Sequence, residues 1–198
     1  MNALDSIVQF DHSATLWVNN LASWWNDGFW WLMSDVQIWF PVYALFMVYA
    51  LWRLGWKKGL AVILSIVLTV VLVDQLANLV KFGVARLRPF WDADMVNGGL
   101  RIPYDNSDAG LYGFFSAHAG NSFGFAVTSY LGLKWNRPEG NFKVFGWVVF
   151  LWAALMSLSR TMMGAHFLGD ITVGALVGLG LGFLMALLAR LVVVKVTE

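Results

Sequence analysis

Long apolar segments are the feature that most constrains how this chain of 198 residues can fold. Hydrophobic residues make up 59% of the sequence, well above the share in ordinary soluble domains. A membrane-spanning helix needs roughly 20 mostly apolar residues. The segments that qualify are residues 36–52, 59–80, 119–134, 144–160 and 171–191. The sequence therefore predicts an all-α fold, a polytopic transmembrane helix bundle.

No Pro- or Ser-rich linker divides the chain, so we expect residues 1–198 to form a single membrane-embedded domain. Cysteine is absent, which excludes disulfides and thiolate metal sites. The first residues lack the basic segment of a cleavable signal peptide, and the spans themselves are expected to direct insertion. Membrane lipids are expected partners, and nucleic acid is not.

Basic residues indicate the orientation of the spans. They gather between the first two spans, between the third and fourth, and near the end of the last, which makes these regions and the C-terminus cytoplasmic by the positive-inside rule. These residues are Arg53, Lys57 and Lys58, then Lys134, Arg137 and Lys143, then Arg190 and Lys195. Five others, namely Lys81, Arg86, Arg88, Arg101 and Arg160, fall on the opposite side and need another explanation.

Residues 1–35 differ from the rest, because they contain four Asp and five Trp but no Lys or Arg. Tryptophan is enriched where membrane meets water, so we expect an interfacial amphipathic segment at the outer surface. This interpretation gives five spans and an N-terminus outside. The alternative is that residues 14–33 form a short sixth span or a re-entrant helix. A sixth span would move the N-terminus to the cytoplasm.

Three polar clusters occur at the outer ends of the later spans: KFGVARLRP at 81–89, FSAHAGNSFG at 115–124 and SRTMMGAHFLGD at 159–170. Lys81 and Arg88 are seven apart and share one helix face if the helix continues toward Pro89. His166 and Asp170 are four apart, which places a carboxylate one turn from an imidazole. That carboxylate can accept the Nδ1 proton and leave Nε2 free as a nucleophile.

The clusters together supply the groups that bind a phosphate. Arginine offers planar, bidentate donation to phosphate oxygens, and lysine adds a point charge. The collected side chains are Lys81, Arg88, Ser116, His118, Arg160, His166 and Asp170. They predict a phosphate-binding site on the outer side of the membrane that the protein spans.

The order K-x6-R-P, Ser-x-His and S-R-x5-H-x3-D resembles the type 2 phosphatidic acid phosphatase superfamily, which includes the vanadium haloperoxidases. The resemblance runs over about 90 residues from Lys81 to Asp170. It implies that His166 attacks phosphorus, that Asp170 orients its imidazole, and that His118 protonates the leaving oxygen. It also implies phosphate binding by Lys81, Arg88, Ser116, Arg160 and the backbone N–H of Ala117, with no metal and no cofactor.

The second cluster departs from the P-S-G-H pattern of the family, because Phe115 stands for proline and Ala117 for glycine. Alanine keeps the N–H donor but disfavours a positive φ. We therefore expect a loop conformation that both residues can adopt.

Other polar residues receive weaker interpretations. Asp74 lies seven before Lys81 within a span, and we assign it a supporting role, together with Ser159. His12 is assigned no role. Arg86 and Arg101 are left open between lipid headgroups, substrate and no function. Residues 90–114 are expected to form an extracytoplasmic loop over the site, with solvated acids rather than a cation site at Asp92, Asp94, Asp105 and Asp108.

The resemblance implies a metal-independent, integral-membrane lipid phosphatase that forms a phosphohistidine. We expect it in the bacterial inner membrane, with its site facing the periplasm or exterior. Undecaprenyl diphosphate ranks first among the expected substrates, followed by lipid A, phosphatidylglycerophosphate and phosphatidic acid. Two alternatives are a non-catalytic lipid-phosphate binding or transport protein and a vanadate-dependent haloperoxidase, which membrane burial disfavours. The sequence leaves the oligomeric state unknown.

Overall fold

The computed structural model describes residues 3–104 and 109–197, and the fold they form is all-α. No β-strand occurs within these ranges, where a single isolated bridge joins Leu87 and Tyr112. The helices are α1 (Ala3–Asn19), α2 (Asp27–Ser34), η1 (Val36–Trp39), α3 (Phe40–Val84), η2 (Pro89–Trp91), α4 (Ala93–Asn97), α5 (Ala117–Asn136), α6 (Lys143–Met162) and α7 (Leu168–Thr197).

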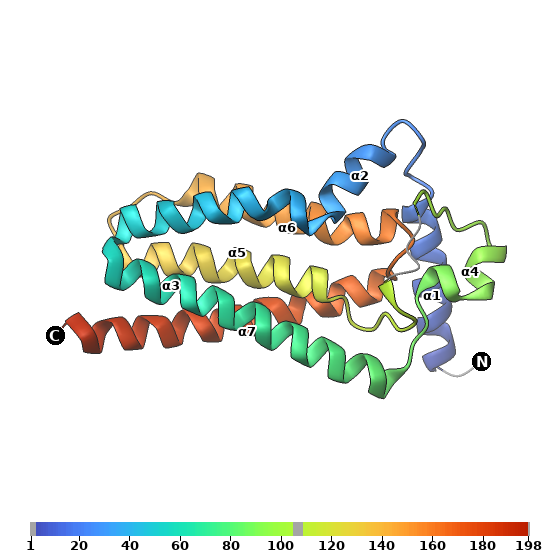
Figure 1. Ribbon diagram of the computed structural model, residues 1–198. Coiled ribbons are helices and arrows are strands. Elements are labelled where there is room, and N and C mark those ends of the chain that lie inside the picture. The colour runs from blue at the N-terminus through green and yellow to red at the C-terminus, as the bar shows by residue number, and fades with distance from the viewer. Residues whose placement is uncertain (1–2, 105–108, 198) are drawn as a thin grey trace.

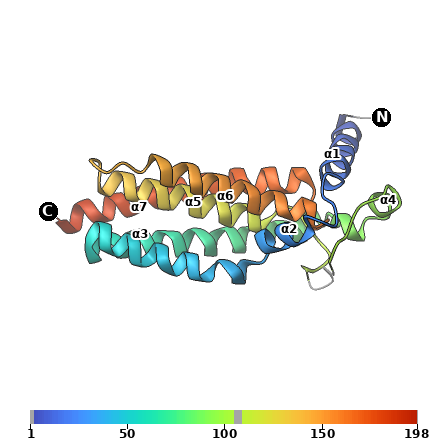
Figure 2. The ribbon, with the colours of Figure 1, turned by 90° about the horizontal axis from the view of Figure 1, so that it is seen from above.

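Helices α3, α5, α6 and α7 run along a common axis and form the bundle (Figure 1, Figure 2). Helix α3 consists of two arms that reverse at Gly55, whose φ of 76° is accessible to glycine at little cost. The arms pack closely beside this turn, where a side chain at Gly59 would lie 2.8 Å from the Cα of Leu51. These arms correspond to the first two predicted spans, and α5, α6 and α7 to the other three, so each predicted segment forms a helix of the bundle.

Helix α5 is the most polar part of the bundle, and it packs against α3, α6 and α7. Three helical stretches of the described chain are long and apolar enough to cross a membrane: 36–84, 143–162 and 168–193. Helix α5 is not among them. Because its neighbours shield α5 from lipid, small and polar residues such as Ser122, Thr128 and Ser129 are buried within protein there.

The N-terminal segment lies at one end of the bundle, opposite the C-terminus (Figure 1). Helix α1 runs across that end rather than along the bundle, and both views agree on this (Figure 2). Residues 14–33 comprise the end of α1, a turn and most of α2. They do not form one continuous helix, and the alternative of a sixth span is not what the structure shows.

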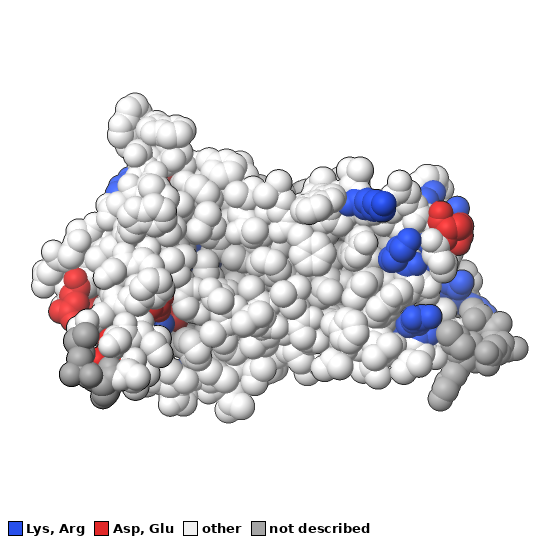
Figure 3. Space-filling model, turned by 180° about the vertical axis from the view of Figure 1, so that it is seen from behind, with Lys and Arg blue, Asp and Glu red and all other residues white. Residues whose placement is uncertain are grey.

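On the face shown in Figure 3, charged side chains lie toward the two ends of the bundle and leave an uncharged band between them. Contacts confirm that the predicted cytoplasmic groups share one end. Arg137 donates to the backbone oxygen of Arg53 at 3.0 Å, and the Arg190 guanidinium lies 5.5 Å from the ring of Trp135. A band without charge is what contact with hydrocarbon requires.

Candidate active site

The three polar clusters meet at the end of the bundle that carries α1. Lys81 lies in the last turn of α3, and Arg88 follows that helix. Ser116 caps α5, and His118 lies in its first turn. Arg160 ends α6, while His166 and Asp170 belong to the connection and the first turn of α7. Electrostatic interactions join His118 to Arg160, His166, Arg88 and Lys81, so the three predicted clusters form one site.

His166 and Asp170 form the predicted pair. The Nδ1 of His166 lies 3.3 Å from Oδ2 of Asp170. Oδ2 also accepts the backbone N–H of Phe167 at 3.1 Å, which fixes the carboxylate within the first turn of α7. Because a carboxylate only accepts hydrogen bonds, Nδ1 carries the imidazole proton and Nε2 carries the lone pair. His166 is 2% exposed, and Asp170 is fully buried.

Arg88 contacts the nucleophilic side of this imidazole. Its Nη1 lies 2.8 Å from Nε2 of His166 and also donates to the backbone oxygen of Ala165 at 3.1 Å. Its Nε donates to the backbone oxygen of Gly110 at 3.0 Å. Arg88 therefore donates to the atom that is predicted to attack phosphorus.

The electrostatic surroundings of His166 favour its neutral form. Burial and the positive charges of Arg88, Arg160 and Lys81 lower the pKa of His166 well below its usual value, with burial the largest cause. A neutral imidazole keeps the Nε2 lone pair available. The site therefore maintains the protonation state that nucleophilic attack requires.

Ser116 and its neighbours form the N-terminus of α5, where hydroxyl and backbone N–H donors could bind a phosphate. The Ser116 hydroxyl accepts the N–H of Ala119 at 3.4 Å, and this leaves its own proton free to donate. Its backbone N–H donates to the backbone oxygen of Asp170 at 3.0 Å, which joins α5 to α7. Ala117 is the first residue of the helix and needs no positive φ, which among the described non-glycine residues occurs at Ala85. The exchange of glycine for alanine is thereby accommodated.

Arg160 and Lys81 complete the set of cations. Arg160 donates from Nη1 to the hydroxyl of Ser34 at the end of α2, whereas its Nε is buried without a hydrogen-bond partner in the described chain. A buried guanidinium N–H without an acceptor is costly. A phosphate oxygen would supply that acceptor. Lys81 interacts electrostatically with Arg88, Arg160, Asp74 and Asp170.

The two predicted supporting residues make contacts away from His166. Asp74 accepts the side-chain amide of Asn121 at 2.8 Å and so links α3 to α5. The Ser159 hydroxyl donates to the backbone oxygen of Met156 at 2.7 Å within α6, and the side chain is fully buried. Their roles in the reaction remain predictions.

Several residues without a definite role in the sequence-based prediction also surround the site. Arg86 forms an ion pair with Asp170, with an Nη1 to Oδ1 distance of 2.9 Å. A side chain at Gly113 would lie 3.1 Å from Oδ2 of Asp170 and 3.5 Å from Nδ1 of His166, so glycine leaves room for the pair. His12, assigned no role, stacks on Phe167 at a ring distance of 4.8 Å. No spacing rule connects residues 11–34 to these positions, which are far apart in the chain.

The described parts of the loop of residues 90–114 contain more regular structure than their composition suggests. The loop contains η2 and α4, and its end returns alongside its start, where the N–H of Arg88 donates to Leu111 and that of Gly113 to Arg86. Asp92 caps α4 by accepting the N–H of Asp94 at 2.9 Å. Asp105 and Asp108 lie outside the described residues. Within the described ranges, no group of three His, Asp or Glu side chains could hold a metal ion.

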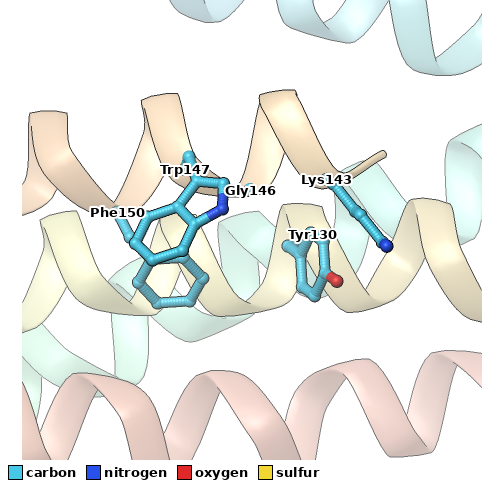
Figure 4. Close-up of a pocket in the computed structure, with 5 residues that line it drawn as sticks. All are labelled: Tyr130, Lys143, Gly146, Trp147 and Phe150. Carbon is cyan, nitrogen blue, oxygen red and sulfur yellow. The ribbon is translucent and has the colours of Figure 1, made fainter. Parts of the chain in front are cut away.

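A shallow groove on α5 and α6 is separate from the polar site. It is lined by Tyr130, Lys143, Gly146, Trp147 and Phe150, from the part of these helices nearer the opposite end of the bundle (Figure 4). None of the predicted site residues lines this groove. Trp147 is 80% exposed, as expected for an aromatic side chain that faces lipid.

Comparison with known proteins identifies the family. The sequence profile described as PAP2 superfamily matches residues 54–193. The chain belongs to the PAP2 superfamily. This confirms the resemblance noted in the sequence, and with it the prediction that the protein is a membrane phosphatase of this superfamily. The match begins at the turn between the two arms of α3 and leaves α1, α2 and the first arm outside.

Two relatives and two solved structures extend over most of the chain. A lipid A 4'-phosphatase of Bacteroides thetaiotaomicron is 29% identical over 88% of this chain and 75% of its own. A second lipid A 4'-phosphatase, from Porphyromonas gingivalis, is 28% identical over 90% of this chain and 72% of its own. The PAP2-type phosphatidylglycerolphosphate phosphatase of Bacillus subtilis superposes with a TM-score of 0.63 at 18% identity, over 98% of this chain and 88% of that one. The structure of Aquifex aeolicus LpxE superposes with a TM-score of 0.61 at 22% identity, over 87% of this chain and 92% of that one. The two structures confirm the fold.

Proposed function

We propose that this protein removes a terminal phosphate from a bacterial envelope lipid through a phosphohistidine formed on His166. The observation that supports this most directly is the His166 imidazole itself. Its Nδ1 faces Asp170 at 3.3 Å, and its Nε2 faces a guanidinium at 2.8 Å. A phosphate that accepts the donation of Arg88 would lie directly beside the Nε2 lone pair.

The reaction starts when the phosphate displaces the Arg88 donor from Nε2. Lys81, Arg88 and Arg160 hold the phosphate oxygens, together with the Ser116 hydroxyl and the N–H of Ala117. Nε2 then forms a bond to phosphorus as the bond to the lipid oxygen breaks, and His118 protonates that oxygen. Asp170 stabilises the positive charge that develops on the imidazole.

Hydrolysis of the intermediate reverses these roles. His118, now deprotonated, accepts a proton from a water molecule as that water attacks the phosphohistidine. The N–P bond breaks, inorganic phosphate is released, and His166 returns to its neutral form. The side chains present supply both the charge stabilisation and the proton transfers, so the scheme requires no metal.

Among the candidate lipids, phosphorylated lipid A ranks first for this chain. The two curated relatives that carry that activity in their names match 88% and 90% of this sequence. Undecaprenyl diphosphate, ranked first from the sequence, is a second candidate because its terminal phosphate presents the same oxygens to the cations. We propose that the site faces the periplasm or exterior of the inner membrane, as the positive-inside rule indicates.

A substrate panel tests this proposal. Purified protein in detergent with EDTA is assayed for phosphate release from phosphorylated lipid A, undecaprenyl diphosphate, phosphatidylglycerophosphate and phosphatidic acid. We expect release from at least one of these lipids, most rapidly from lipid A, and none from His166→Ala. A binding or transport protein would instead bind these lipids without releasing phosphate. Equal release by His166→Ala, or release that EDTA abolishes, would contradict the mechanism.

A further inference from the structure

Arg86 is the cation that contacts the buried carboxylate of the site directly. Its Nη1 donates to Oδ1 of Asp170 at 2.9 Å, whereas the other oxygen, Oδ2, faces His166 and the N–H of Phe167. Asp170 is fully buried, and the Arg86 side chain is 22% exposed. A buried carboxylate needs such a partner, because burial without one disfavours its charge.

The second nitrogen of Arg86 binds an acid from the N-terminal helix. Its Nη2 donates to Oδ2 of Asp11 in α1 at 2.7 Å. The other oxygen of Asp11 accepts the N–H of Gly169 at 2.8 Å, at the start of α7. One guanidinium therefore joins two carboxylates, and α1 is fixed to the same turn of α7 that carries Asp170.

Aromatic contacts hold the guanidinium in place. Its carbon lies 3.7 Å from the ring centroid of Phe167, a fully buried residue between His166 and Leu168. Arginine stacked on an aromatic ring and bonded at both ends has little freedom to move. Arg88 and Lys81 also act on Asp170 electrostatically, but neither forms an ion pair with it in the structure.

These contacts distinguish Arg86 from the phosphate-binding cations. Arg88 contacts His166 Nε2, where the phosphate would lie, and Arg160 has a buried Nε without a partner. Arg86 instead uses both terminal nitrogens on carboxylates, on the far side of the His166–Asp170 pair. Its geometry suits a role in holding Asp170 rather than in binding substrate.

We propose that Arg86, held by Asp11 of α1, is a positioning residue that keeps the Asp170 carboxylate charged and oriented toward Nδ1 of His166. This inference rests on the proposed function. It also makes α1, which lies outside the matched part of the family, a contributor to the catalytic site.

The test is the steady-state kinetics of Arg86→Gln, Arg86→Lys and Arg101→Gln on the preferred lipid of the wild-type protein. Arg101→Gln is a matched control, because Arg101 pairs with Asp27 at 2.9 Å, is also about a quarter exposed and lies at the same end of the bundle. Detergent size exclusion and thermal unfolding verify that each variant is folded.

We expect Arg86→Gln to lower kcat at least about tenfold with KM within about twofold, because its charge acts on the nucleophile and not on substrate binding. Arg86→Lys should recover part of the lost kcat, because lysine restores the charge beside Asp170 but not the planar contact with both carboxylates. Arg101→Gln should stay within about twofold of wild type. The Asp11→Asn variant should lower kcat less than Arg86→Gln does, because the ion pair to Asp170 persists.

Three results would overturn the inference: an unchanged kcat for Arg86→Gln, a loss confined to KM, or an Arg86→Lys variant as impaired as Arg86→Gln. A purely structural role predicts equal losses in Arg86→Gln and Arg101→Gln at matched stability. Failure of the proposed function is a separate outcome, because the wild-type protein would then release no phosphate from any lipid of the panel.

Discussion

Arg88 is a cation of the site that contacts the predicted nucleophile directly. It donates to Nε2 of His166 and to two backbone oxygens, and it is 5% exposed. Lysine carries the same charge but cannot make these contacts from one planar group. We expect Arg88→Lys to lower kcat/KM by about 10² to 10³, the usual effect of losing one transition-state donor.

Phosphate-release kinetics in detergent test this prediction. Lys57→Gln is the control, because Lys57 is exposed near the Gly55 turn, at the opposite end of the bundle. It should remain within about twofold of wild type, as expected for an exposed surface charge. A lysine variant with wild-type kcat/KM would show that charge alone suffices at this position.

The lowered pKa of His166 predicts a pH dependence of stability. The folded protein holds this imidazole neutral, whereas the unfolded chain binds a proton near about pH 6.5. The unfolded state therefore binds more protons below this pH, and stability falls as pH decreases, by at most about 1.4 kcal/mol per unit. Thermal unfolding of wild type and His166→Gln between about pH 7.5 and about pH 5.5 measures this.

As the pH is lowered over this range, the thermal unfolding midpoint of the wild type should decrease more than that of His166→Gln. Glutamine removes one group that takes up a proton when the chain unfolds. Parallel decreases in both proteins would mean that His166 binds its proton equally well in the folded state. That result would contradict the account of its buried, cation-rich surroundings.

At the scale of elements, glycines determine how closely α5 and α7 approach. A side chain at Gly178 would lie 2.0 Å from the backbone oxygen of Gly120, whereas one at Gly180 would meet nothing within 4 Å. Gly178→Ala should separate the helices that carry His118 and Asp170. We expect it to lower stability by about 1–3 kcal/mol, as overpacking does, and to reduce kcat.

Gly180→Ala provides the matched control, because it adds the same methyl group two residues along the same helix. Alanine favours helix over glycine, so this variant should be as stable as wild type or slightly more so. Thermal unfolding and phosphate release distinguish the two variants. Equal behaviour of both would show that α5 and α7 are less tightly packed than the structure indicates.

Helix α1 presents polar residues to the protein and apolar residues outward. Asp11, Thr15 and Asn19 recur at intervals of four, and Thr15 and Asn19 are fully buried. Asp11 and Thr15 accept backbone N–H groups at the start of α7, and Asn19 donates to a backbone oxygen at the end of α6. The opposite side exposes Phe10 and Trp17 at 75% and 68%. This polarity is reversed from that of a soluble surface helix and suits contact with the membrane interface.

Asn19 anchors this helix to the end of α6. Its side chain accepts the N–H of Arg101 at 2.8 Å and donates to the backbone oxygen of Thr161 at 2.9 Å. Asn19→Ala leaves these buried groups without partners, and we expect a loss of about 1–3 kcal/mol in thermal unfolding. The exposed neighbour Asn20 donates to the backbone oxygen of Leu16 at 2.9 Å and, at the long distance of 3.5 Å, to that of Gly99, so Asn20→Ala should change the stability little. Similar losses in both would argue against a specific anchor.

Sequence spacing predicted the elements of the site better than their surroundings. The i,i+4 interval of His166 and Asp170 predicted their pairing within one helical turn. The roles of Asp11 and Arg86 could not be predicted in this way. Their contact joins positions 75 residues apart, and no local periodicity specifies which surface of the bundle a separate helix covers.

For the whole molecule, the two charged ends make orientation in the membrane testable. The chain has no cysteine, so a single introduced cysteine reports one position. Val96→Cys lies at the end with the site, and Lys57→Cys near the Gly55 turn at the other end. In intact cells of a bacterial host, an impermeant maleimide should label the first, and the second only after permeabilisation. The reverse pattern would place the site in the cytoplasm.

Most helices of the bundle followed from apolar length, because hydrocarbon thickness fixes how many residues cross it, whereas α5 is less apolar and is packed among its neighbours. The position of residues 1–35 did not follow in the same way. The apolar and aromatic side chains there are compatible with both an interfacial helix and a short span. The decisive information is tertiary, namely the burial of Thr15 and Asn19 against the end of the bundle.

The most direct test of the account is to trap the covalent intermediate. Purified protein is mixed with lipid carrying a radiolabelled phosphate, quenched in base within one turnover, and separated from lipid. The account predicts protein-bound label that is stable in base, labile in acid and absent from His166→Ala. Label of the same stability in His166→Ala, or turnover by wild type with no labelled protein at any time, would contradict attack by His166.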